Sequence, residues 1–137
     1  MIDKLPDNEQ ILILKSGYLS LKNIINHVHC NDKYPEFKNI LITNPNNKYG
    51  YKYDSKLDKF ILVSKKELLE ELLGSRISDI DEFYEKHENK LNTRIKTAIT
   101  NVVKNYETDK KYKRDVITET TAQIYNNRDI IDASITN

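Results

Sequence analysis

The alternation of apolar and polar residues along the chain predicts a short sheet framed by helices. After a lead-in segment, residues 1–17, that forms either a short helix behind Pro6 or an edge strand, the pattern becomes helical with Ser20 as the expected N-cap. The apolar positions then recur every three or four residues on one face: Leu21, Ile24, Ile25 and Val28. This helix is expected to end at residues 30–31, because Asn-Asp is a poor interior pair and Pro35 follows.

Three short apolar runs after this helix predict the strands. Residues 40–42 form the first run, and a segment dense in turn-forming residues follows it. Residues 51–53 and 60–63 alternate in polarity on either side of the loop DSKLD, which is the pattern of a β-hairpin. Residues 18–63 are therefore predicted to form a helix-plus-hairpin unit, with a three-stranded antiparallel sheet packed on the helix.

The second half, residues 64–131, is predicted to be helical. Ser64 and Glu67 have the spacing of a capping box, and Gly74 is the expected end of the helix that they open. A long amphipathic helix is then predicted from an apolar stripe with steps of three or four: Ile80, Tyr84, His87, Leu91, Ile95, Ile99, Val102 and Tyr106. A last helix over residues 111–125 and a frayed tail over residues 132–137 complete a single α+β domain.

The composition says more about the cellular compartment of the protein than about its function. The chain has 137 residues, a formal net charge of +1 and one cysteine, so neither a global field nor an internal disulfide framework is expected. The apolar runs are shorter than the ~20 residues that span a bilayer. The opening MIDKLPDNEQ also lacks the basic start of a signal peptide. We therefore expect an intracellular protein that is not secreted, makes no membrane contact and has no evident small-molecule substrate.

Charge is distributed unevenly over the helical half. Residues 64–89 carry eight acids and four bases, a balance of −4, whereas residues 90–114 carry eight bases and two acids, a balance of +6. Helix dipoles favour part of this gradient. The basic region, with Tyr106 and Tyr112 interleaved, could hold phosphates or pair with the acidic end of a second copy. Its candidate nucleic-acid-binding residues are Arg94, Lys96, Lys104, Lys110, Lys111, Lys113 and Arg114.

His27, His29 and Cys30 are residue types that bind zinc, but their spacing argues against a metal site. His27 and Cys30 share a helix face while His29 points elsewhere, and a second cysteine is lacking. We predict neither metal nor cofactor. The segment is interpreted instead as a structural junction in which His29 bonds to the backbone of residues 31–39. The residues of this junction are His29, Asn31, Pro35, Glu36 and Asn39.

The spacing of His29 and Asn39 resembles that of metal-dependent HNH-like nucleases, whose core is a ββα unit. In this chain His29 ends a helix and Asn39 opens a strand, so the element order differs. We expect Asn39 to bond to its own backbone as a turn residue. No catalytic residue is predicted, and a nuclease at His29 and Asn39 is kept as a second alternative.

Several short motifs in order resemble a domain found at the C-terminus of giant DNA virus proteins of the mimivirus kind. They are His29-Cys30-Asn31, Tyr34-Pro35-Glu36, Asn39-Ile40, KYGYKYD, KFILVSKKELLEELL and Tyr125-Asn126-Asn127-Arg128, spread over residues 18–131. Cys30 stands where the family has an aromatic residue, Lys38 where it often has His, and Phe60 where Trp is common.

This resemblance implies a viral setting, in the host cytoplasm (the viral factory) or in the virion, and specifies no activity. In such proteins the domain often follows zinc-finger or other DNA-binding modules. The present chain is then expected to be either a stand-alone copy or an excised domain.

Two functions follow as hypotheses. Short strands span ~17–20 Å, and the predicted long helix is about twice that length, so part of its stripe needs another partner, either the final helix or another chain. The favoured hypothesis is a non-enzymatic viral interaction module that forms a homodimer through four residues: Leu91, Ile95, Ile99 and Val102. The alternative is nucleic-acid binding by residues 90–114.

Overall fold

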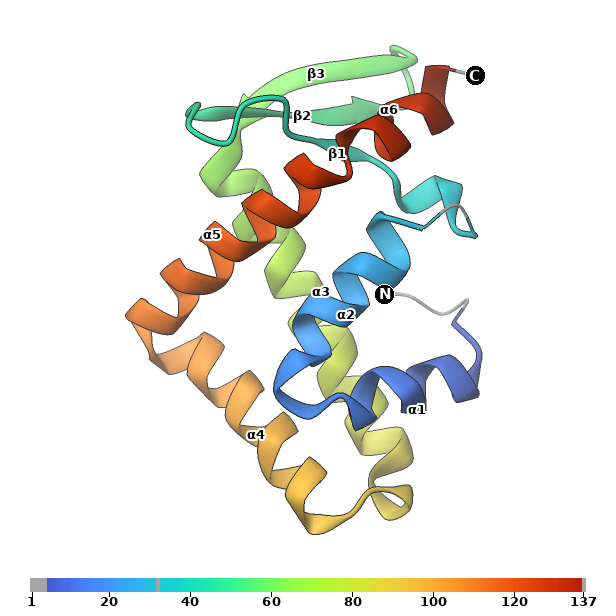
Figure 1. Ribbon diagram of the computed structural model, residues 1–137, viewed down its shortest axis with the longest axis vertical. Coiled ribbons are helices and arrows are strands. Elements are labelled where there is room, and N and C mark those ends of the chain that lie inside the picture. Colours follow the sequence, from blue (N-terminus) through green and yellow to red (C-terminus); the bar gives the residue numbers. More distant parts are fainter. Residues whose placement is uncertain (1–4, 32, 137) are drawn as a thin grey trace. The chain divides into compact units, whose positions relative to one another are not determined.

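The computed structural model describes residues 5–31 and 33–136 and has the predicted α+β fold. The described elements, in chain order (Figure 1), are α1 (Asp7–Lys15), η1 (Gly17–Leu19), α2 (Ser20–His29), η2 (Pro35–Phe37), β1 (Ile40–Leu41), β2 (Tyr49–Asp54), β3 (Lys59–Ser64), α3 (Lys65–His87), η3 (Glu88–Lys90), α4 (Thr93–Thr108), α5 (Lys110–Asn126) and α6 (Arg128–Thr136).

The chain divides into two compact units, each built from two separate segments. The first unit comprises Met1–Ile24 and Leu73–Asp115, and the second comprises Ile25–Leu72 and Val116–Asn137. The divisions fall inside α2, α3 and α5, so each of these helices contributes residues to both units. That all 137 residues form a single domain stays a prediction.

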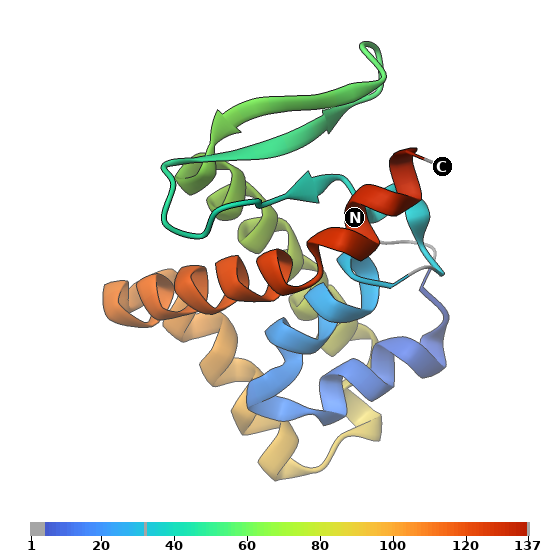
Figure 2. The ribbon, with the colours of Figure 1, turned by 45° about the horizontal axis from the view of Figure 1, so that its top comes forward.

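The second unit contains the predicted three-stranded sheet (Figure 2), with the antiparallel strand order β1-β2-β3. Tyr51 of β2 lies opposite both Leu41 of β1 and Leu62 of β3. A Cβ added at Gly50 would lie 3.3 Å from the Leu68 side chain, so α3 packs closely against β2. The core of this unit joins residues from the sheet, α3, α5 and α6: Ile40, Leu41, Ile42, Leu68, Leu69, Leu72, Ile124 and Ile131.

The first unit is helical. Its α4 packs against η1 and α1, and the end of α3 belongs to the same unit. Its buried apolar side chains include residues of α1, α3 and α4 and the linking Leu91: Ile13, Leu14, Leu73, Ile77, Ile80, Phe83, Leu91, Ala98, Ile99 and Val102. Among the described helices, we find none that combines the length and the apolar character needed to cross a membrane.

The prediction of one continuous helix from Ile80 to Tyr106 is wrong, because the helix is interrupted between α3 and α4. The long helix of the second half is α3, which begins at Lys65 and continues through Gly74, where a helix end was predicted. It stops at His87, and Asn92 then starts α4 by accepting a hydrogen bond from the Ile95 N–H at 2.9 Å. Leu91, although extended, is still buried. The apolar stripe therefore stays in phase across a break that periodicity alone does not detect.

The other boundaries agree more closely with the prediction. Of the two possibilities left open behind Pro6, the structure has the helix, α1. The predicted last helix is α5, and the predicted frayed tail, residues 132–137, is helical as far as Thr136 in α6, with Asn137 outside the described residues. Ser20 opens α2 as predicted, but its hydroxyl donates to the carbonyls of Ile13 and Gly17 instead of capping the helix.

Candidate nucleic-acid interface

The apolar stripe predicted to bind a second chain is buried within a single chain. Ile99 and Val102 are each 1% exposed, Leu91 is buried as well, and Ile95 is partly buried. These side chains therefore need no partner from another chain to be buried, because η1 and α1 already pack on α4. The homodimer itself stays a prediction, now without this stripe as its basis.

The contact between η1 and α4 depends on a glycine. Gly17 has φ +60°, a conformation that residues with a Cβ rarely adopt. A Cβ built there would lie 3.3 Å from the Cβ of Ala98 and 3.9 Å from Ile95 Cδ1. The Gly17 backbone thus lies close to the Ala98 and Ile95 side chains, so the apolar face of α4 is turned toward η1 and its other face is turned outward.

The outward face of α4 is polar and basic. Residues three, four and seven positions apart share one side of a helix, and the exposed or half-buried members of this side are Arg94, Thr97, Asn101, Lys104 and Thr108. The Thr97 and Thr108 hydroxyls donate to backbone carbonyls four residues earlier, at 3.0 and 2.8 Å. The face therefore offers cations and small polar groups.

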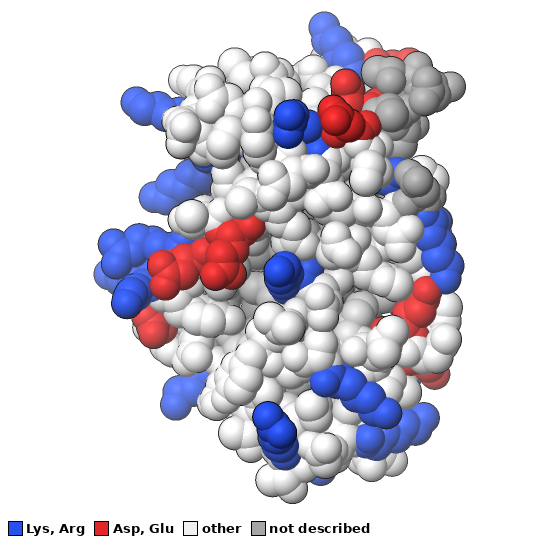
Figure 3. Space-filling view, in the orientation of Figure 1, with Lys and Arg blue, Asp and Glu red and all other residues white. Residues whose placement is uncertain are grey.

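The start of α5 continues this basic surface. Asp109 joins the two helices, and its carboxylate accepts hydrogen bonds from the N–H groups of Lys111 and Tyr112, at 3.0 and 3.1 Å. The Lys110, Lys111 and Arg114 side chains are exposed. Figure 3 shows blue side chains gathered over the turn between α4 and α5, with red carboxylates beside them.

Most of these cations are not neutralised by the chain. In the described part of the chain, five predicted binding residues make no ion pair: Arg94, Lys96, Lys104, Lys110 and Lys111. Lys113 differs, since its ammonium lies 5.3 Å from the centre of the Tyr106 ring in a cation–π contact. The surface can therefore attract an anion without first breaking an internal salt bridge.

Sequence reasoning missed Tyr18 as a neighbour of this surface. Tyr18 is 62% exposed on η1, and its hydroxyl oxygen accepts a hydrogen bond from Asn101 Nδ2 at 3.1 Å. The signal that could have found it is Gly17, since an isolated glycine between two apolar segments marks a turn.

The hydrogen bond predicted between His29 and the backbone of residues 31–39 is confirmed. The His29 side chain is buried at the end of α2, and its Nδ1 lies 2.7 Å from the Phe37 carbonyl oxygen, inside the predicted segment 31–39. Asn31 accepts from the Lys33 N–H at 3.0 Å, and Pro35 and Glu36 form the first turn of η2. The junction thus ties the end of α2 to the turn that precedes β1.

Asn39 does not bond to its own backbone as predicted. Its carbonyl accepts from the Tyr53 N–H at 2.8 Å, which extends the pairing of β1 with β2. Its side-chain oxygen Oδ1 is buried and has no hydrogen-bond partner among the described residues. The residue therefore acts here through its main chain, at the edge of the sheet.

The thiol beside this junction is buried and weakly acidic. Burial raises the pKa of Cys30 to about 11, although nearby Lys38 acts in the opposite direction. Within the described residues, no three His, Cys, Asp or Glu side chains are grouped so as to hold a metal ion. At neutral pH the Cys30 sulfur is a thiol, which is a poor metal ligand and a poor nucleophile.

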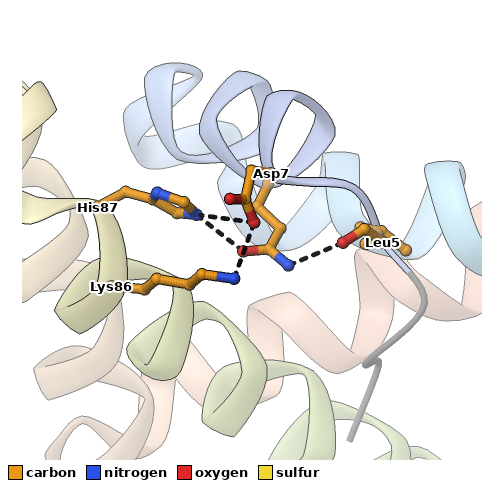
Figure 4. A network of polar contacts seen from close by, with 5 residues as sticks. Leu5, Asp7, Lys86 and His87 are labelled. Atoms are coloured by element: carbon orange, nitrogen blue, oxygen red, sulfur yellow. Dashed lines mark hydrogen bonds and ion pairs between the residues drawn. The ribbon is translucent and has the colours of Figure 1, made fainter.

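A polar network fastens α1 to the end of α3 in the first unit (Figure 4). His87, 2% exposed, donates from Nε2 to Gln10 Oε1 at 2.8 Å, and Gln10 Nε2 donates to the Leu5 carbonyl at 2.8 Å. Lys86 Nζ pairs with Asp7 Oδ1 at 2.8 Å. Burial lowers the pKa of His87; Asp7 opposes this shift, while Lys86 and Lys90 add to it. The hydrogen bond from Lys86 lowers the pKa of Asp7.

Comparison with known protein families, curated proteins and solved structures finds no match to this chain. The residues and geometry described above are therefore the basis for inferring function.

Proposed function

We propose that the chain is a non-enzymatic nucleic-acid-binding protein that holds the phosphate backbone on α4 and the first turns of α5. The observation that carries this proposal is the burial of the apolar stripe of α4, which leaves the basic face outward. Four cations of that surface, Arg94, Lys104, Lys110 and Lys111, lack an ion-pair partner in the described part of the chain. From the sequence, nucleic-acid binding by this surface was the alternative to self-association. The burial of the stripe now favours nucleic-acid binding.

The charge distribution supports binding of phosphates at one local site and not attraction by the net charge of the whole chain. The whole chain carries +1, but residues 90–114 carry +6. At 0.1 M salt, exposed charges act over roughly 10 Å, so a phosphate near this surface interacts mainly with the local excess. Binding would release counterions from the nucleic acid and would weaken steeply with added salt. It would also be largely independent of sequence, because phosphate contacts carry no base information.

The resemblance to giant-virus domains that follow DNA-binding modules agrees with this proposal and is evidence by analogy only. A viral protein of this kind would meet nucleic acid in the viral factory of the host cytoplasm or in the virion. The viral setting therefore forms part of the proposal. The binding surface on α4 and α5 is the part of the proposal that experiments on this protein can test.

Two charge-matched double variants test the site. Lys110→Gln with Lys111→Gln removes two exposed cations from the proposed surface. Lys56→Gln with Lys59→Gln removes two exposed cations from the hairpin and changes the net charge equally. In fluorescence anisotropy with a labelled oligonucleotide, the first variant should weaken binding and make the slope of log K against log salt shallower by about 2. The hairpin variant should leave that slope unchanged; equal effects of the two variants would overturn the proposed location.

Self-association remains a second candidate, and a different feature favours it. The Lys65 N–H donates to the Lys48 carbonyl at 2.9 Å, so alternate residues of β3 face β2. Phe60, Leu62 and Ser64 consequently direct their backbone groups outward, where no further strand of the described chain pairs with them. Leu62 is also 58% exposed. Unpaired edges of this kind are templates for pairing.

A second copy fits this edge. Antiparallel pairing about Leu62 sets it opposite its own counterpart and sets Phe60 opposite Ser64, so all three outward residues find partners. The paired edge is short, so a weak dimer is expected. Light scattering over a concentration series should show a mass increase that Leu62→Lys abolishes. A monomer at every concentration would rule this candidate out.

A further inference from the structure

An exposed aromatic ring stands among the unpaired cations of α4. The Tyr18 hydroxyl oxygen accepts a hydrogen bond from Asn101 Nδ2 at 3.1 Å. Asn101 lies on the outward side of α4, seven residues after Arg94 and three before Lys104. At 1.5 Å per residue these cations lie roughly 10 Å and 5 Å from Asn101 along the helix axis, one on each side. The ring is therefore flanked by positive charge along the axis.

The position of this ring is fixed by its neighbours in the chain. Gly17, directly before it, adopts φ +60°, and a Cβ added there would lie only 3.3 Å from the Ala98 Cβ of α4. Ser20, two residues after it, donates to the carbonyls of Ile13 and Gly17 at 2.9 and 2.7 Å. The turn that carries Tyr18 is thus held at both ends, while the side chain itself stays 62% exposed.

A single exposed tyrosine is common on protein surfaces and by itself implies nothing. Tyr18 differs in its surroundings, because phosphate-attracting side chains lie on both sides of it and its hydroxyl is anchored at one edge. Proteins that bind single strands combine these two features: a basic track for the backbone and an aromatic ring on which a base stacks. In a duplex the base faces are already stacked on one another and cannot reach such a ring.

We propose that Tyr18 is a stacking platform for an unpaired base, so that the first unit binds single-stranded nucleic acid in preference to duplex. This inference rests on the proposed function, since the cations of α4 would hold the flanking phosphates. Base–aromatic stacking contributes a factor of roughly 5 to 100 in affinity per base. The ligand is defined by its chemistry, a flexible polyanion with free base faces, which both single-stranded DNA and single-stranded RNA provide.

The test is fluorescence anisotropy on the full chain with three labelled probes of one sequence: a 20-nucleotide DNA strand, the RNA strand and the DNA duplex. The single strands should bind more tightly than the duplex. Tyr18→Ala should weaken single-strand binding roughly 5- to 100-fold and leave duplex binding unchanged. Tyr18→Phe, which keeps the ring, should retain most of the affinity. Tyr18→Leu keeps an apolar side chain without an aromatic face and should behave like Tyr18→Ala, provided that circular dichroism shows an intact fold.

Tyr49→Ala is the matched control, since Tyr49 is 50% exposed on β2, in the second unit. It should change no affinity. Equal binding of single strand and duplex that is insensitive to Tyr18→Ala but falls with salt would overturn this inference and leave the proposed function intact. The absence of salt-dependent binding to every probe would overturn both. Binding of either DNA or RNA supports the platform, and a preference for RNA would identify an added contact to the 2′-hydroxyl.

Discussion

Replacing His29 by alanine tests the junction between α2 and β1. The substitution removes the hydrogen bond from Nδ1 to the Phe37 carbonyl, 2.7 Å long, from a side chain that is 4% exposed. Leaving this partly buried carbonyl without its partner costs about 1–3 kcal/mol. The ring also packs edge-on against Phe37 with centroids 6.2 Å apart, a contact worth about 0.5–1.5 kcal/mol.

The expected loss in the free energy of unfolding is therefore about 1.5–4.5 kcal/mol, a large part of the ~5–15 kcal/mol of an ordinary domain. Urea denaturation followed by circular dichroism measures it, and hydrogen exchange at residues 37–41 locates it. His29→Asn is the informative companion, because its Nδ2 can occupy the place of the donor nitrogen. It should recover the hydrogen-bond contribution but not that of the ring.

Asn26→Ala, at an exposed position of the same helix, serves as the control and should change stability by less than about 0.5 kcal/mol. If His29→Ala cost no more than Asn26→Ala, the junction would not depend on this hydrogen bond. If His29→Asn were as damaging as His29→Ala, the loss would come from the ring and not from the donor.

Three further predictions concern the first unit. Asn92→Ala removes the cap of α4 and should cost about 1 kcal/mol in chemical denaturation, while Asn92→Asp should retain most of the stability. Gly17→Ala and Gly74→Ala should change stability in opposite directions. Gly17→Ala should destabilise the protein by about 1–2 kcal/mol, because φ at this position is +60°. Gly74→Ala should stabilise it by about 0.5–1 kcal/mol, because Gly74 lies at an exposed position inside α3. Destabilisation by Gly74→Ala would contradict a helix that continues through this residue. Because burial lowers the pKa of His87, the unfolded chain binds more protons than the folded chain just below pH 6.5. The contribution of His87 to stability should be complete above that pH and should fall as the pH drops toward the folded pKa. His87→Gln should flatten this part of the plot of stability against pH.

Local pattern was sufficient for most helices and for the hairpin, because both are encoded within a few residues of each other. The hairpin follows from alternating polarity around residues 54–58, and α2 follows from its apolar spacing. The break after His87 was missed for a physical reason. Leu91 remains buried in an extended conformation, so the stripe stays in register while the helix ends. The competing signal was Asn92, a strong N-cap residue.

The candidate site was only half predictable. Its cations lie close together in the sequence, and the charge balance of residues 90–114 identifies them directly. Their outward orientation depends on the packing of η1 on α4, and Tyr18 and Asn101 are 83 residues apart. The hydrogen bond between Gln10 and His87 likewise joins residues 77 apart. Such contacts are set by tertiary packing, which hydrophobic periodicity does not encode.

The most direct test of nucleic-acid binding is the salt dependence of affinity for a 20-base-pair duplex, measured by fluorescence anisotropy between 50 and 300 mM salt. Each phosphate neutralised by a cation contributes about −0.9 to the slope of log K against log salt on duplex DNA. Engagement of four to seven of the predicted cations should give a linear plot with a slope of about −4 to −6. A slope near zero, or no binding at 50 mM salt, would contradict the account.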